Sequence, residues 1–234
     1  MLKMLSALAV REVLVAAGAD FTRDSGHQID FEFGTMGAVQ ARLAAGEAAD
    51  LAILAVPVME PWLKNGLLSE RTDLARTGIG VAIGQGATVP EISNVDSFVR
   101  TLLDARSVAL TDPSAGGTAG VYLAGLLERL GIADAIKPKT IFQRNGFLVA
   151  QSVAEGEAEI GMTLISEIVP VEGAVVAGPL PPELQNSVTY AAGIFANSEN
   201  RDAALAFIRF LASPALSERW KSRGFELAGG QEAE

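Results

Sequence analysis

The sequence contains no cysteine and only one histidine, His27. The lack of cysteine excludes thiol nucleophiles, disulfide bonds, zinc–thiolate sites and cysteine-held iron–sulfur clusters. His27 lies in the polar run 23–28, where we expect an exposed loop, and a single imidazole is a poor nucleus for a metal site. We therefore expect neither a metal nor a cofactor.

The sequence also contains fewer basic than acidic residues. It has 18 lysines and arginines and 28 aspartates and glutamates, which give a formal net charge of −10. Such a chain lacks the positive footprint of a nucleic-acid-binding protein and is repelled by anionic lipid surfaces. We expect neither nucleic acid nor membrane as a partner. The net charge does not exclude a small anionic ligand, because local donors can override the global field.

Long apolar runs are missing as well. No stretch reaches the roughly 20 apolar residues that span a bilayer, so no membrane insertion is expected. The first residues, Met1 to Ser6, do not form a charged segment followed by an apolar run and a cleavage site. We expect a cytoplasmic protein, or a periplasmic one if an export signal has been removed.

What the chain does contain is an alternation of short apolar runs and helical periods, in which apolar residues make up 49%. Ile29, Phe31 and Phe33 alternate with acidic residues, which predicts a half-buried strand. Strands separated by helices predict βαβ units, parallel sheets and an α/β fold. Strands are expected at residues 2–5, 29–33, 50–55, 78–83, 108–110, 140–142, 160–163 and 189–195; helices at 10–21, 38–45, 57–65, 94–103, 117–130, 147–155 and 201–211; loops at 69–73 and 178–182.

These elements form two similar α/β halves with a strand and a helix left over at the end of the chain. We therefore expect two lobes. The first comprises residues 1–80 and 190–234, and the second comprises residues 81–189.

The strongest local signal is the segment Asp112 to Gly120, which follows a strand and precedes a long helix. Glycines let the backbone approach a ligand, and the first amides of a helix lie unpaired at the positive end of its dipole. The turn is therefore a candidate anion site, with Ser114, Gly116, Gly117 and Thr118 as ligand-binding residues. A plain connector remains the alternative. Neither the dinucleotide-binding nor the phosphate-loop spacing is present.

Three other strand ends carry polar candidates. Thr35 lies in the loop 33–38, Arg144 and Asn145 begin the turn 143–146, and Thr163 and Ser166 end a buried strand. An arginine can clamp a carboxylate with two parallel hydrogen bonds, although an exposed arginine on a solvated face is equally compatible with the sequence.

Glu167 is the only carboxyl group among these strand ends and is thus the catalytic acid–base candidate if the protein is an enzyme. A glutamate that hydrates or caps a helix start is the alternative.

Phe33-Gly34-Thr35-Met36-Gly37, the segment 43–50, Asp112-Pro113 and Gly156-Glu157-Ala158-Glu159-Ile160-Gly161 together resemble motifs of the periplasmic molybdate-binding family over nearly the whole chain. The resemblance implies a two-lobed type-II periplasmic-binding fold, crossover strands near residues 78–83 and 188–195, and a ligand held at helix N-termini in a cleft between the lobes. It adds Ser6 and Met36 to the expected ligand-binding positions.

The sequence departs from that family where molybdate would be held, because Ala9, Met36 and Leu164 stand where the family has hydroxyls. Too few donors then remain for a buried tetrahedral oxyanion. We therefore expect a solute-binding protein that closes on a di- or tricarboxylate, with a transporter permease as a possible partner. The alternative is a cytoplasmic isomerase of an unsaturated carboxylate, in a branch that resembles aconitate isomerase.

Overall fold

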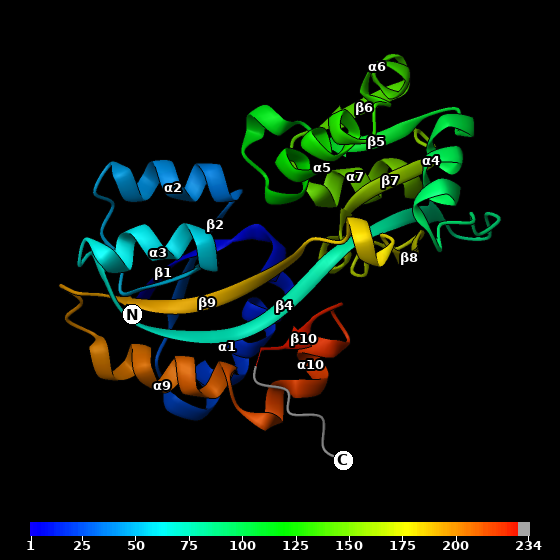
Figure 1. Ribbon diagram of the computed structural model, residues 1–234. Helices are drawn as coiled ribbons and strands as arrows, with labels where there is room; N and C mark the ends of the chain where they lie inside the picture. Colours follow the sequence, from blue (N-terminus) through cyan, green and yellow to red (C-terminus); the bar gives the residue numbers. More distant parts are fainter. Residues whose placement is uncertain (229–234) are drawn as a thin grey trace. The chain divides into compact units, whose positions relative to one another are not determined.

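The computed structural model describes residues 1–228 (Figure 1). Contacts within the chain divide it into two units. Unit 1 comprises residues 1–76 and the chain from Val188 onward, and unit 2 comprises Thr77–Ser187. Each unit is a β-sheet with helices, so the predicted α/β fold is confirmed.

Unit 1 is built around β1 (Leu2–Ala7), which pairs in parallel with β2 (Ile29–Gly34) and β3 (Leu51–Ala55). The strand order is β2-β1-β3, followed by β9 (Ser187–Phe195) and β4 (Leu68–Gly84). The helical segments are η1 (Leu8–Val10), α1 (Arg11–Ser25), α2 (Met36–Ala44), α3 (Val56–Lys64), α9 (Arg201–Leu211), η5 (Pro214–Leu216) and α10 (Ser217–Lys221).

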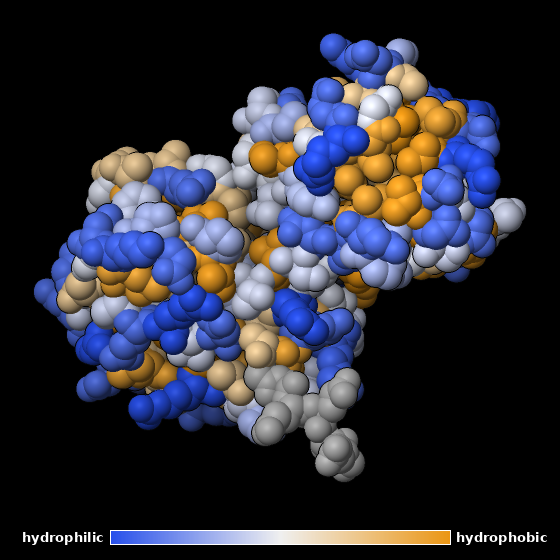
Figure 2. Space-filling model, viewed as in Figure 1, coloured by the Kyte–Doolittle hydropathy of each residue, from blue (hydrophilic) through white to orange (hydrophobic). Residues whose placement is uncertain are grey.

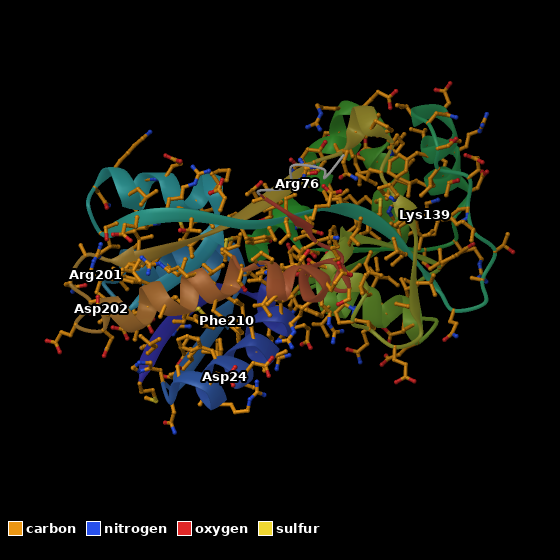
Figure 3. The ribbon with its side chains drawn as sticks, turned by 90° about the horizontal axis from the view of Figure 1, so that it is seen from below. Asp24, Arg76, Lys139, Arg201, Asp202 and Phe210 are labelled. Atoms are coloured by element: carbon orange, nitrogen blue, oxygen red, sulfur yellow. The ribbon has the colours of Figure 1, made fainter. Side chains whose placement is uncertain are left out.

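Helices α1 and α9 pack side by side in unit 1 (Figures 1 and 3). The ring of Phe21 lies 5.0 Å from that of Phe207 and 5.9 Å from that of Phe210, measured between centroids. Aromatic pairs at this separation add to the burial of apolar surface. The helix that returns to unit 1 at the end of the chain is thereby joined to the first helix.

Unit 2 repeats this design around β5 (Val108–Thr111), which pairs in parallel with β6 (Thr140–Gln143) and β7 (Ile160–Leu164). The second part of β4 runs antiparallel to β7 and to β8 (Ala174–Pro179). The helical segments are α4 (Val95–Asp104), η2 (Pro113–Ala115), α5 (Thr118–Arg129), α6 (Ala133–Ile136), η3 (Lys137–Lys139), α7 (Gly146–Ala154), α8 (Ile165–Ile168) and η4 (Pro182–Leu184).

The two units share one strand order, β2-β1-β3 in unit 1 and β6-β5-β7 in unit 2. In both, a helical segment follows the carboxyl end of each of these strands. Ligands of open α/β sheets bind outside the carboxyl ends of the strands, where the connections leave a central strand in opposite directions. In unit 2 that point lies between β5 and β7, and in unit 1 it lies between β1 and β3.

Several helices begin and end where the sequence predicts, because local hydrogen bonds satisfy their ends. Asn94 and Ser97 form a capping box at the start of α4, and Asn145 accepts a hydrogen bond from the Leu148 amide at the start of α7. Lys139, labelled in Figure 3, donates from Nζ to the carbonyl oxygens of Leu103 and Ala105 at the end of α4. A cation is favourable at a helix C-terminus.

Three expectations from the sequence are wrong. Residues 69–73 are part of the long strand β4 rather than a loop, and their polar appearance reflects exposed side chains such as Arg71, which is ion-paired to Glu60 and Asp73. The segment 178–182 was expected to be a loop, yet Gly178 and Pro179 end β8. Neither sheet is purely parallel, because β9 pairs antiparallel with β3 and β4 pairs antiparallel with β7.

No helix in residues 1–228 combines the length and the apolar character that a bilayer crossing requires. Figure 2 shows an orange area over unit 2, the unit that carries most of the exposed large apolar side chains of the described chain, among them Val89, Val121 and Phe142.

The contact between α5 and β5 predicts opposite effects of the same substitution at two glycines of α5. A Cβ at position 120 would lie 2.6 Å from the Thr111 carbonyl oxygen, whereas a Cβ at position 125 would meet only the tip of Arg129 at 3.5 Å. Gly120→Ala should lower the free energy of unfolding by about 1–3 kcal/mol, and Gly125→Ala should raise it by about 0.5–1 kcal/mol. Denaturant unfolding measures both, and equal effects would contradict the close packing of α5 on β5.

Candidate functional site

The carboxyl end of β5 leads into the glycine-rich turn and the start of α5. Thr111 is buried, with 3% of its surface exposed. Gly116 has a φ of 68°, a conformation that favours glycine, and Gly117 is the N-cap of α5 with a φ of −73°. A Cβ on Gly117 would lie 3.1 Å from Cγ2 of Thr111, so the turn is held closely against the end of the strand.

The hydrogen bonds of the turn decide which of its donors a ligand can use. The Ser114 amide donates to Oδ1 of Asp112 at 2.8 Å, and the amides of Ala115 and Gly116 donate to backbone oxygens within the turn. The first amides of α5 have no acceptor inside the helix, and their N-cap, Gly117, has no side chain to cap them. The usable donors are thus concentrated at Gly117 and Thr118.

Asp112 limits the turn further. Hydrogen bonding by Ser114 lowers the pKa of the Asp112 carboxyl below its usual range, so this side chain is ionised at neutral pH. Its charge disfavours an anion near Ser114, whose exposed hydroxyl remains a predicted contact.

The carboxyl end of β6 leads to Arg144, Asn145 and Gly146. Arg144 is exposed and forms no ion pair within the described chain, so its guanidinium is available to a ligand. The side-chain oxygen of Asn145 accepts from the Leu148 amide at 3.0 Å and therefore serves α7. Gly146 is the buried first residue of α7.

The carboxyl end of β7 carries a buried, hydrogen-bonded carboxyl group. Thr163 is fully buried and donates from Oγ1 to Oε2 of Glu167 at 2.7 Å. Glu167, in α8, is only 7% exposed. A Cβ on Gly146 would lie 1.9 Å from Oε2 of Glu167 and 2.1 Å from Oγ1 of Thr163. The Glu167 carboxyl therefore lies directly against the first residue of α7, and only glycine fits at position 146.

Burial raises the pKa of Glu167 to about 7, although the hydrogen bonds from Thr163 and from the Leu164 backbone oppose this effect. Burial disfavours the charged form of a carboxyl group. The neighbouring Ser166 is 2% exposed, and its hydroxyl has no hydrogen-bond partner among the described residues. The end of β7 thus combines a carboxyl group that titrates near neutral pH with an unsatisfied hydroxyl.

In unit 1 the predicted residues make contacts inside the unit. Ser6 is fully buried and donates from Oγ to the Ala7 carbonyl at 3.2 Å, and Oγ1 of Thr35 accepts from the Ala38 amide at 3.3 Å. The sulfur of Met36 accepts from the Ala55 amide at 3.5 Å. These contacts organise the carboxyl ends of β1, β2 and β3, and a ligand-binding role for Ser6, Thr35 and Met36 stays a prediction.

Sequence reasoning named Glu167, Thr163 and Ser166 but missed Gly146. The sequence feature that could have identified Gly146 is its position directly after Asn145, at a helix start where alanine would have the higher helix propensity. No group of three or more histidine or acidic side chains within residues 1–228 is arranged to hold a metal ion.

The chain thus has two α/β units with equivalent strand orders, β2-β1-β3 and β6-β5-β7, and in each unit helical segments start at the carboxyl edge of the sheet. The chain belongs to the family of bacterial extracellular solute-binding proteins, whose model matches residues 2–226.

Individual relatives refine this assignment. The chain is 30% identical over 195 residues to an aconitate isomerase of Pseudomonas sp., covering 81% of this chain and 71% of the relative. It is 24% identical over 231 residues to the molybdate-binding protein ModA of Escherichia coli, covering 96% and 88%. The solved periplasmic molybdate-binding protein of Azotobacter vinelandii superposes with a TM-score of 0.77 at 18% identity, covering 96% of this chain and 98% of the other. The predicted resemblance to both branches is confirmed.

The raised pKa of Glu167 predicts a pH-dependent stability. Its carboxyl has a pKa of about 7 in the folded chain, against an ordinary value of 4.5, so the folded state holds a proton that the unfolded chain has lost between these pH values. The contribution of this carboxyl group to the free energy of unfolding is fully present below about pH 4.5 and is lost as the pH rises through about 7. Since one pKa unit is worth about 1.4 kcal/mol, the whole effect is about 3 kcal/mol.

The measurement is the free energy of unfolding from about pH 4 to about pH 8 for the parent and for Glu167→Gln, which cannot titrate. We expect the parent to lose about 3 kcal/mol relative to the variant over this range. Glu172→Gln, at an exposed position, is the control and should follow the parent. Parallel pH curves for the parent and Glu167→Gln would contradict the burial of an uncharged carboxyl.

Proposed function

We propose that the chain binds a small organic anion with two or three carboxylate groups. The observation that carries this proposal is the set of unused donors at the start of α5, the Thr118 hydroxyl and the amides behind it. Helix N-termini favour negative charge by about 0.3–1 kcal/mol when exposed, and hydrogen bonds to charged groups contribute roughly 1.5–3 kcal/mol each. Such a site can hold an anion in a protein of net charge −10.

Arg144 supports a carboxylate ligand in particular. It is exposed and follows β6, the strand next to β5, and a guanidinium matches the planar geometry of a carboxylate with two parallel hydrogen bonds. The ligand contacts that we propose in unit 2 are Ser114, Gly116, Gly117, Thr118, Arg144, Asn145 and Thr163.

A tetrahedral metal oxyanion is the less suitable ligand. Ala9 and Leu164 are apolar and buried, with 6% and 3% exposure, and Met36 uses its sulfur within unit 1. None of them offers the hydroxyl that the resemblance led us to expect, and a dehydrated oxyanion needs a donor for each of its oxygens. Although two of the relatives described above are molybdate-binding proteins, the 30% identical relative is named for aconitate, a tricarboxylate.

Isomerisation of an unsaturated polycarboxylate is the second candidate function. The specific observation in its favour is Glu167, a carboxyl group at the end of β7 whose pKa of about 7 suits it to accept and return a proton at neutral pH. A binding protein for transport implies a permease as partner, whereas a cytoplasmic isomerase implies none. Cell fractionation of the native host protein distinguishes the two settings.

The ligand class can be tested by calorimetry and thermal denaturation. We expect propene-1,2,3-tricarboxylate (aconitate) or a related di- or tricarboxylate to bind and to raise the unfolding temperature, since a ligand at 100 times its Kd stabilises by about 2.7 kcal/mol. Molybdate and sulfate at equal concentration serve as comparisons and should bind more weakly. Sub-micromolar molybdate affinity without carboxylate binding would overturn the proposal.

The anion site itself is tested by Thr118→Ala. The loss of one hydrogen bond to a charged ligand group should weaken binding about tenfold or more. The hydroxyl caps no helix, so the free energy of unfolding should change little. Thr118→Ser retains the hydroxyl and should keep the parent affinity. Unchanged affinity in Thr118→Ala would mean that the turn is only a connector.

A further inference from the structure

Unit 2 contains a pocket that the proposed function does not use. Its volume is about 230 Å³, and it lies between α5, α6 and η3 on one side and the strands β5 and β6 on the other (Figure 1). All the residues that line it belong to unit 2. Gly117, Thr118 and Glu167 are not among these residues, so the pocket is separate from the donors of the candidate anion site.

The pairing of β5 with β6 forms the floor of the pocket. Leu110 lies opposite Phe142, and Val108 lies opposite Thr140. Since alternate residues of a strand share a face, these side chains are directed to the same face of the sheet. On this face Leu110 is buried, whereas Phe142 is 52% exposed. β6 is the last strand of the sheet, and a large aromatic ring is therefore left half-covered at the edge of the pocket.

Helix α5 forms the opposite wall and leaves the space open. Gly120, Ala124, Leu127 and Glu128 all line the pocket, and their spacing places them on one face of the helix. They extend over roughly 12 Å of helix. The first two have at most a methyl group as side chain, so the helix does not fill the space beside the Phe142 ring.

The two ends of the pocket differ in chemistry. Helix α5 starts at the carboxyl end of β5 and returns toward the start of β6, so Gly120 and Phe142 lie toward one end, and Glu128 and Thr140 lie toward the other. Lys137 also lines the pocket. Glu128 and Lys137 are exposed, and neither forms an ion pair within the described chain. One end of the pocket is thus apolar, and the other carries two unpaired charges of opposite sign.

The hydroxyl of Thr140 adds to this asymmetry. It donates to the Ile136 carbonyl at 3.0 Å. A hydroxyl has one proton to donate and two lone pairs, so Thr140 can only accept a hydrogen bond from a ligand. The polar end therefore provides two acceptors, Glu128 and Thr140, for a positively charged group and one donor, Lys137, for a negatively charged group.

Charge complementarity and volume define the class of ligand. A monoanion would pair with Lys137 but approach Glu128, and a cation would do the reverse, whereas a zwitterion pairs with both. A cavity of about 150 Å³ holds benzene, and drug-sized ligands need roughly 300–1,000 Å³. The pocket thus fits a phenyl or branched aliphatic group with a short charged end, and a phenyl ring can pack against Phe142.

We propose that this pocket binds an apolar α-amino acid. Its side chain lies between α5 and β6, its ammonium group faces Glu128 and Thr140, and its carboxylate faces Lys137. The inference does not rest on the proposed function, because the two sites share none of their ligand contacts.

The ligand class is tested by calorimetry of the full chain with L-phenylalanine. Three comparison compounds each lack one feature: 3-phenylpropanoate lacks the ammonium group, 2-phenylethylamine lacks the carboxylate, and glycine lacks the ring. L-Phenylalanine should bind saturably. Each comparison compound should bind about tenfold or more weakly, because it loses a hydrogen bond to a charged group or the burial of the ring. Equal affinity for 3-phenylpropanoate or 2-phenylethylamine would refute the assignment to a zwitterion.

The position of the site is tested by filling the pocket. Ala124→Leu places a larger side chain in the space beside Phe142 and should weaken the binding of L-phenylalanine at least tenfold. Val121→Leu is the matched control, because Val121 is on the same helix, is 55% exposed and does not line the pocket. It should keep the parent affinity. Parent affinity in a folded Ala124→Leu, checked by circular dichroism, would mean that the amino acid binds elsewhere, for example through its carboxylate at the glycine-rich turn.

Two charge variants complete the test, and they decide it if Ala124→Leu does not fold. Glu128→Gln should weaken L-phenylalanine and 2-phenylethylamine but strengthen 3-phenylpropanoate, and Lys137→Gln should weaken L-phenylalanine and 3-phenylpropanoate. Both positions are exposed, as is Lys64 in unit 1, where Lys64→Gln is the control and should change nothing. Absence of L-phenylalanine binding in the parent, or unchanged affinity in both charge variants, refutes the inference. Polycarboxylate binding is measured separately, so either proposal can fail alone.

Discussion

The parallel pairing of three strands in each unit is the constraint on which the candidate site depends. Parallel neighbours must be joined by crossovers, so each strand ends at the same edge and is followed there by a helix start. In unit 2 this places the starts of η2 and α5, of α7 and of α8 at one edge of β6-β5-β7. The topology alone therefore places residues that are far apart along the chain at that edge, among them Thr118, Gly146 and Glu167.

At the end of β7 two physical effects shift the pKa of the Glu167 carboxyl in opposite directions. Contact with Thr163 and with the Leu164 backbone favours the ionised form of Glu167, whereas its removal from water favours the neutral form. Burial dominates because no cation enters the surrounding elements. The same contact explains Gly146, since a side chain at that position would displace either the carboxyl or the Thr163 hydroxyl. The glycine is there for the carboxyl, not for backbone freedom.

Most of the fold follows from sequence patterns because each pattern reports a local preference. The apolar run of β3, the capping residues Asn94 and Asn145, and the helical period of α9 mark elements that the structure contains. The first part of β4 was missed because its exposed side chains leave no apolar alternation to detect. Strands were predicted within β9 and the second part of β4, but their antiparallel pairing was not, since the direction of a strand depends on the path of the whole chain.

The candidate site was only partly predictable for a related reason. A glycine-rich turn signals free amides, but the sequence does not show that Asp112 and Pro113 already accept hydrogen bonds from Ser114, Ala115 and Gly116. Likewise Glu167 is visible as a carboxyl group after a strand, whereas its burial depends on packing between β7, α7 and α8. Sequence locates the donors and acceptors, and tertiary contacts determine which of them remain unused.

Asp112 and Glu167 show how one unit supports two opposite carboxyl chemistries. Hydrogen bonding by Ser114 lowers the pKa of the first, and burial raises the pKa of the second. Titratable groups whose pKa values are driven apart in this way are the usual basis of acid–base assignments in proteins. The negative charge of Asp112 is unfavourable for an anion near Ser114, whereas the start of α5 at Gly117 and Thr118 has no side-chain cap. In its neutral form Glu167 adds no negative charge at the neighbouring strand end, whereas the ionised Asp112 does so at the end of β5.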